Sequence, residues 1–117
     1  MISKSAHICE GAKLGKDVTV EPFAYIAADV EIGDGCWIGP GAVILDGARL
    51  GKNCKVHTAA VVAGLPQDLK FKGEYSTAVV GDNTTIRECA TISRGTAAKG
   101  VTTVHLTETI FAATVKK

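Results

Sequence analysis

The chain has 117 residues, 13 Lys and Arg against 12 Asp and Glu, and a formal net charge of +1. That length suits one domain, and the balanced charge removes the electrostatic argument for nucleic acid or an anionic membrane as an obligate partner. No stretch approaches the ~18 apolar residues of a transmembrane helix, and the first residues lack the apolar segment of a signal peptide. These features predict a cytoplasmic protein without membrane insertion.

Small and branched aliphatic residues dominate the composition. Hydrophobic residues make up 46% of the chain, but aromatic residues only 5%, and there are 13 glycines. Such a composition indicates a narrow interior filled by aliphatic side chains rather than a core built on aromatic side chains. The cysteines Cys9, Cys36, Cys54 and Cys89 form no CxxC pair. We expect reduced thiols that pack as small apolar residues, with no disulfide and no zinc site.

Aliphatic residues recur at every sixth position from residue 2 to residue 62. All of these positions are Ile, Leu or Val: Ile2, Ile8, Leu14, Val20, Ile26, Ile32, Ile38, Ile44, Leu50, Val56 and Val62. The fourth residue after each is small or short up to residue 60: Ala6, Ala12, Val18, Ala24, Val30, Cys36, Ala42, Ala48, Cys54 and Ala60. Six is neither the helical period nor the alternation of a strand, which excludes an amphipathic helix and an ordinary hairpin.

This period predicts short parallel strands joined by corners, with one large and one small residue of each six pointing inward. Three sixes close one triangular coil, and stacked coils bring positions that are three sixes apart into vertical columns. Ile26 then lies above Ile8, and Cys54 above Cys36. Glycines near the corners fit positions that need a positive φ or a close approach of the backbone.

A polar segment, AGLPQDLKFKGEYSTAV, interrupts the period at about 63–79. The phase resumes at Val80, Ile86 and Ile92. Because Val80 follows Val62 by three whole sixes, we expect a loop to leave the coil here and the chain to return in register. Polar loops on a rigid repeat scaffold commonly carry function, although a solvated excursion has the same composition.

The pattern of sixes resembles the hexapeptide-repeat acyltransferase superfamily, whose fold is a left-handed parallel β-helix. This handedness follows from the resemblance, since general crossover rules favour right-handed connections. The run PQDLKFKGE at 66–74, with IRE at 86–88 and RGT at 94–96, resembles more specifically the UDP-N-acetylglucosamine O-acyltransferases. We therefore expect a β-helix over 1–100 and a divergent tail, or one further irregular coil, over 101–117.

The resemblance implies an enzyme that moves a (R)-3-hydroxyacyl chain from acyl carrier protein to the 3-hydroxyl of UDP-N-acetylglucosamine, the first step of lipid A synthesis. It implies a cytoplasmic homotrimer with active sites between subunits and neither cofactor nor metal. Gln67, Asp68 and Lys70 match family positions that contact the sugar or the acyl chain. Lys70 offers a cationic donor, while Asp68 and Gln67 can hold hydroxyl and amide groups. Arg87 and Arg94 are interpreted as residues of a trimer interface or a solvated face, with a structural role.

The resemblance weakens after Gly100. The family's general base is a histidine in a His-x-Ala-His-Asp stretch, whose first histidine would fall at Val115 and whose catalytic one would fall just past Lys117. The spacing of His7, His57 and His105 suggests neither a substitute base nor a metal cluster. No catalytic residue is assigned, and we expect an inactive, incomplete form that stops before the family's C-terminal coils and helical domain.

Two alternatives stay open beside the leading function. One is another hexapeptide acyltransferase, which the PQDLKF run disfavours. The other is a catalytically inactive β-helix that serves as a binding or oligomerisation module, which the missing histidine favours.

Overall fold

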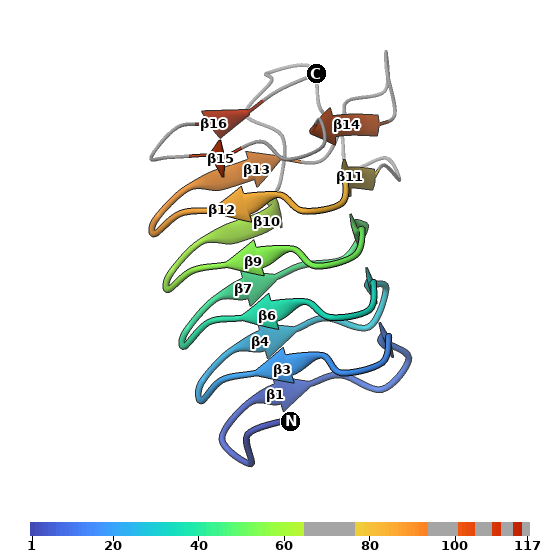
Figure 1. Cartoon of the computed structure of the whole chain (residues 1–117), viewed down its shortest axis with the longest axis vertical. Helices are drawn as coiled ribbons and strands as arrows, with labels where there is room; N and C mark the ends of the chain where they lie inside the picture. Colours follow the sequence, from blue (N-terminus) through green and yellow to red (C-terminus); the bar gives the residue numbers. More distant parts are fainter. Residues whose placement is uncertain (65–76, 94–100, 105–108, 111–113, 116–117) are drawn as a thin grey trace.

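The computed structural model describes residues 1–64, 77–93, 101–104, 109–110 and 114–115. In this part of the chain every regular element is a short strand, and the strands stack into successive coils from the N-terminus upward (Figure 1). Three consecutive strands lie on three different walls, and every third strand returns to the same wall. No helix long and apolar enough to cross a membrane occurs among the described residues.

Each wall is a parallel sheet whose neighbouring strands come from successive coils. The first sheet is formed by β1 (His7–Ile8), β4 (Tyr25–Ile26), β7 (Val43–Ile44), β10 (Val61–Gly64), β13 (Thr91–Ser93) and β16 (Thr114–Val115). The second is formed by β2 (Lys13–Leu14), β5 (Glu31–Ile32), β8 (Ala48–Leu50), β11 (Thr77–Val80) and β14 (Val101–Val104). The third is formed by β3 (Thr19–Val20), β6 (Trp37–Ile38), β9 (Lys55–Val56), β12 (Thr85–Ile86) and β15 (Thr109–Ile110).

The predicted columns are confirmed by the strand register. Ile8 pairs with Ile26, and Ile26 pairs with Ile44, so that each step up the stack advances the chain by three sixes. Backbone amides of one coil donate to carbonyls of the next, as in the 2.9 Å bond from the Tyr25 amide to the Ala42 oxygen. Stacking therefore satisfies the backbone polar groups that such short strands could not satisfy alone.

The residues predicted to point inward form the core. From residue 18 to residue 62 all of them are buried, and the series continues past the interruption with Val80, Thr84, Ile86, Ala90 and Ile92. Residues of the first coil are less covered than those of the coils above: Ile8 and Leu14 are only partly buried, and Ile2 is 50% exposed. The interior is narrow and aliphatic, as the composition predicts.

Two columns of corner residues adopt left-handed backbone, and glycine is not required in either. One column holds Asp17, Gly35, Asn53 and Asn83, and the other holds Phe23, Gly41, Ala59 and Cys89. Asn and Asp tolerate this conformation, whereas a bulky residue such as Phe23, at φ 66°, is strained there. The sequence prediction looked only for glycine at corners and so missed most of these positions. At Gly33 glycine serves close approach instead, because an added Cβ would lie 2.6 Å from the Gly51 carbonyl carbon.

The interruption changes the wall to which the chain returns. Val80 does not lie above Val62; it pairs with Leu50, five sixes earlier in the chain, on the second sheet. Val62 instead pairs with Ile92, also five sixes away, on the first sheet. The phase of six is kept, but this coil is longer by two sixes than the coils below it. The period alone could not show this, because a six-residue phase is shared by all three walls.

Candidate functional site

The predicted substrate residues Gln67, Asp68 and Lys70 lie within 65–76, outside the described residues. The structure instead describes the two strands that flank this segment. β10 ends at Gly64 on the first sheet, and β11 begins at Thr77 on the second. The described chain therefore stops on the first sheet and resumes on the second, and residues 65–76 connect these two strands in the sequence.

The end of β10 departs from the regular ladder just before the segment begins. Ala63 is buried and has a φ of 67°, and the register with β13 shifts between Val62 and Gly64. A shift of this kind is a bulge, which redirects a strand away from its neighbours. The regular ladder therefore becomes irregular at the point where the period is interrupted.

An ion-pair cluster lies on the second sheet, next to the strand that follows residues 65–76. The Arg49 guanidinium of β8 donates from Nη2 to the Asp29 carboxylate at 2.8 Å and from Nη1 to the Asp29 and Ala48 carbonyl oxygens at 2.9 Å each. Its Nε lies 3.7 Å from a carboxylate oxygen of Glu31 on the coil below. Val79 of β11 pairs directly with Arg49, so this cluster supports the first residues after the segment.

A second group of polar and aromatic side chains runs along the corner that follows the third sheet. The Trp37 indole N–H donates to a Glu21 carboxylate oxygen at 2.8 Å, and the His57 ring meets Trp37 edge to face at 5.1 Å. His57 Nδ1 lies 3.9 Å from a carboxylate oxygen of Glu88, a residue of the coil above. The sequence prediction missed this group because the longer coil hides the spacing between His57 and Glu88.

The histidines do not assemble a catalytic or metal site in the described part of the chain. His7 stacks on Tyr25 at 5.4 Å in the lowest coils, and His105 lies outside the described residues. The Cys9 sulfur lies 3.5 Å from the Tyr25 hydroxyl oxygen, and hydrogen bonding with Cys9 raises the pKa of Tyr25. Among described residues, no three His, Cys, Asp or Glu side chains group closely enough to hold a metal ion.

Arg87 lies on the surface above His57, and its Nε donates to the Glu88 carboxylate at 3.1 Å with 42% of the side chain exposed. Arg94 lies outside the described residues. The structure therefore places Arg87 in a local ion pair, and its predicted interface role stays a prediction.

Comparison with known proteins gives these strands a family context. Residues 29–64 match the model of the bacterial transferase hexapeptide (six repeats). The chain is 45% identical over 102 residues to the acyl-[acyl-carrier-protein]–UDP-N-acetylglucosamine O-acyltransferase of Sulfurovum sp. (strain NBC37-1), with 87% of this chain covered. It is 48% identical over 103 residues to the protein of the same name from Chlorobaculum parvum, with 88% covered. The chain is a relative of the UDP-N-acetylglucosamine O-acyltransferases.

The fold comparison agrees with this family relationship. The crystal structure of the UDP-N-acetylglucosamine acyltransferase from Bacteroides fragilis 9343 superposes with a TM-score of 0.95 at 48% identity, over 98% of this chain. The expected fold class, an all-β left-handed parallel β-helix, is thereby confirmed. The chain spans 39% of the length of the two acyltransferase relatives and 46% of the superposed structure.

Proposed function

We propose that this chain forms part of an acyltransferase that moves a (R)-3-hydroxyacyl chain from acyl carrier protein to the 3-hydroxyl of UDP-N-acetylglucosamine, the first step of lipid A synthesis. The enzyme would act in the cytoplasm as a homotrimer. The observation that carries the proposal is the 48% identity over 103 residues to a protein named for this donor and acceptor. Identity at that level extends well beyond what shared repeats of six would require.

The proposed binding residues are Gln67, Asp68 and Lys70, between β10 and β11. Acyl transfer to a sugar needs groups that orient the nucleotide sugar and the acyl chain before the hydroxyl attacks the thioester carbonyl. The Lys70 ammonium can donate to an anionic or carbonyl oxygen, while the Asp68 carboxylate accepts from sugar hydroxyls. The bulge at Ala63 comes just before the segment that carries these side chains, and the strand after it pairs with the strand of Arg49.

Transfer also requires a base that takes the proton of the attacking hydroxyl and donors that stabilise the oxyanion. We assign neither role to a described residue. His57, whose ring lies beside the Glu88 carboxylate, is engaged at a corner after the third sheet, whereas the proposed binding residues follow β10 and precede β11 in the sequence. The role proposed for this chain is therefore substrate binding.

The test is calorimetric titration of the purified chain with UDP-N-acetylglucosamine. We expect Lys70→Ala and Asp68→Ala each to weaken binding at least about tenfold, because each removes a charge-assisted hydrogen bond. Lys55→Ala, which removes an exposed lysine of β9 on another wall, is the matched control and should leave affinity unchanged.

Three results would count against the proposal. They are failure of the wild-type chain to bind, equal affinity in the Lys70 and Asp68 variants, and preference for a nucleotide sugar with a different sugar. The last would favour another hexapeptide acyltransferase. Binding of carrier-linked 3-hydroxyacyl chains, measured by the same titration, then tests the donor side.

A further inference from the structure

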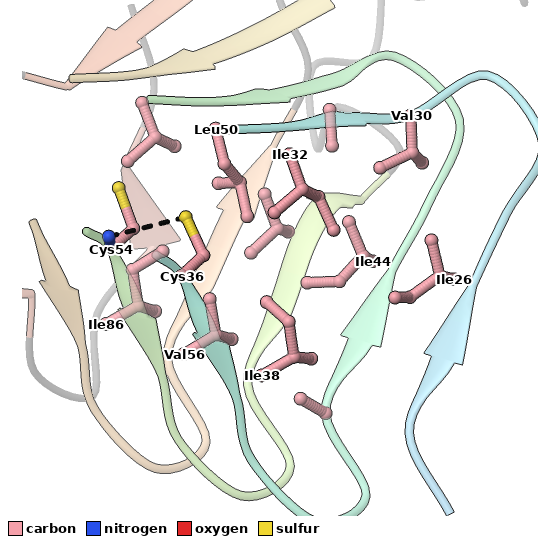
Figure 2. Close-up of a cluster of buried hydrophobic side chains, with 14 of the residues drawn as sticks. Ile26, Val30, Ile32, Cys36, Ile38, Ile44, Leu50, Cys54, Val56 and Ile86 are labelled. Atoms are coloured by element: carbon pink, nitrogen blue, oxygen red, sulfur yellow. Dashed lines mark hydrogen bonds between the residues drawn. The ribbon is translucent and has the colours of Figure 1, made fainter. Parts of the chain in front are cut away.

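Two buried cysteines occupy the same corner position in adjacent coils. Cys36 precedes β6 and Cys54 precedes β9, and these two strands are paired through Trp37 and Lys55. The backbone amide of Cys54 donates to the Cys36 sulfur at 3.4 Å, as Figure 2 shows. The two residues are 1% and 0% exposed, and both thiols are free.

The stacking of the coils brings the two residues into disulfide range. Neighbouring strands of a sheet lie about 4.8 Å apart, and Cα atoms joined by a disulfide lie roughly 4.4–6.8 Å apart. The Cys36 sulfur already lies against the backbone of Cys54. The neighbouring Cys54 thiol, together with burial, raises the pKa of Cys36.

Forming a Cys36–Cys54 disulfide would also cost hydrogen bonds that the free thiols make. The Cys36 thiol donates to the Gly51 carbonyl at 3.0 Å, and the Cys54 thiol donates to the Gly81 carbonyl at 3.1 Å. Both hydrogen bonds would be lost on oxidation. Thr84, at the same position one coil higher, donates to the same Gly81 carbonyl at 2.9 Å, so that oxygen would keep a partner.

We propose that Cys36 and Cys54 form a redox-sensitive clamp whose disulfide ties two adjacent coils together. In exchange with a small disulfide such as oxidised glutathione, one cysteine thiolate attacks a glutathione sulfur, breaks its S–S bond and releases one glutathione thiolate. The second cysteine thiolate then attacks the cysteine sulfur of the mixed disulfide and releases the other glutathione. The two protons lost by the protein thiols end on the two released glutathione thiolates.

The column itself supplies matched controls. The residues at this position in successive coils are Val18, Cys36, Cys54 and Thr84, and all four are buried. Cys36→Val and Cys54→Thr therefore introduce side chains that the same corner already accommodates one coil away. Either variant should fold and should be unable to form the bond.

The experiment measures the equilibrium with glutathione rather than the rate, because exchange at buried thiols must pass through local opening. The chain carrying Cys9→Ser and Cys89→Ser is equilibrated with mixtures of oxidised and reduced glutathione, in native buffer and in concentrated guanidinium. Samples are quenched with acid, free thiols are alkylated, and the disulfide fraction is read from the intact mass. The natural chain is run in parallel, and trypsin should release residues 17–49 linked to residues 53–55.

We expect the equilibrium constant for the disulfide to be at least tenfold larger in the folded chain than in guanidinium, with a matching rise in melting temperature on oxidation. Cys36→Val and Cys54→Thr should melt cooperatively and show neither effect. An equal or smaller constant in the folded chain would overturn the proposal, because folding would then oppose the bond. Linked peptides that join other cysteines would overturn it as well.

Discussion

The coils before residue 62 and those after it stack the same way, but they contain different numbers of residues. In the lower coils a residue pairs with the one three sixes later, as His7 does with Tyr25. Above, Val62 pairs with Ile92 across five sixes, and Ile86 pairs with Ile110 across four. The extra residues fall between strands, while the paired strands stay parallel.

The β-helix therefore constrains its walls and its core but not the length of its corners. Ile86 and Ile92 are as fully buried as Ile26 and Ile44, although the coil that contains them is interrupted. A corner only has to deliver the next strand to its wall, so it can lengthen at a modest entropic cost. Function can therefore be added at a corner without repacking the interior, and the proposed binding residues fall in the sequence between the strands β10 and β11.

The strongest test of the comparison is a core truncation in one column. Ile44→Ala should lower the free energy of unfolding by about 3 kcal/mol or more, because Ile44 is fully buried between the paired residues Ile26 and Val62. Ile8→Ala should lower it by about half as much, since Ile8 in the first coil is only partly buried. Urea titration followed by Trp37 fluorescence measures both values.

Similar losses for the two variants would contradict this account, because the first coil would then be packed as tightly as the middle of the stack. Val62→Ala extends the series to the border of the interruption. Its side chain is fully buried between Ile44 and Ile92, so its loss should exceed that of a similar truncation in the first coil.

The repeating part of the fold could be predicted almost completely from the sequence. A large aliphatic residue recurs at every sixth position, because each coil buries it against the same residue type in the coils above and below. That signal identified the columns, the buried cysteines and the return of the phase at Val80. It is read without knowing the handedness, which came from the resemblance to known proteins.

The features that could not be predicted from the sequence depend on contacts between coils of unequal length. The wall of Val80 could not be predicted, because the phase of six does not distinguish the three sheets. The ion pair of Arg49 with Asp29 joins residues that share no column. Left-handed corners at Ala59 and Cys89 carry no glycine to mark them. The roles of Gln67, Asp68 and Lys70 stay predictions.

A smaller effect is expected where Arg49 braces the wall beneath the interruption. Arg49→Ala should lower the free energy of unfolding by about 1–2 kcal/mol, because it removes charge-assisted hydrogen bonds to Asp29 in a half-buried setting. Amide hydrogen exchange should also quicken at Ala78, whose amide donates to the Gly47 carbonyl at 2.9 Å on that wall.

The control for Arg49 is Lys55→Ala, another outward-facing cation but an exposed one, which should change stability by less than about 0.5 kcal/mol. Exchange at Thr19, far below the interruption, should be unaffected by Arg49→Ala. Equal acceleration at Ala78 and Thr19 would mean that Arg49 acts on global stability and does not brace the return strand.

The smallest effect is a pH dependence in the upper coils. Hydrogen bonding to its own backbone amide, then the charges of Arg87 and His57, hold the pKa of Glu88 below its ordinary value of 4.5 against the opposing effect of burial. A carboxylate whose pKa is depressed on folding stabilises the folded state above its unfolded pKa and loses that contribution as the pH falls through its folded pKa. Glu88→Gln should therefore lower the melting temperature slightly at pH 7, and the difference from wild type should vanish as the pH drops well below 4.5.

Thermal melts of both proteins across this pH range measure the difference, with Glu10→Gln in the first coil as the control for general charge effects. A difference that persists unchanged in acid would show that Glu88 stabilises its corner through packing and not through its charge.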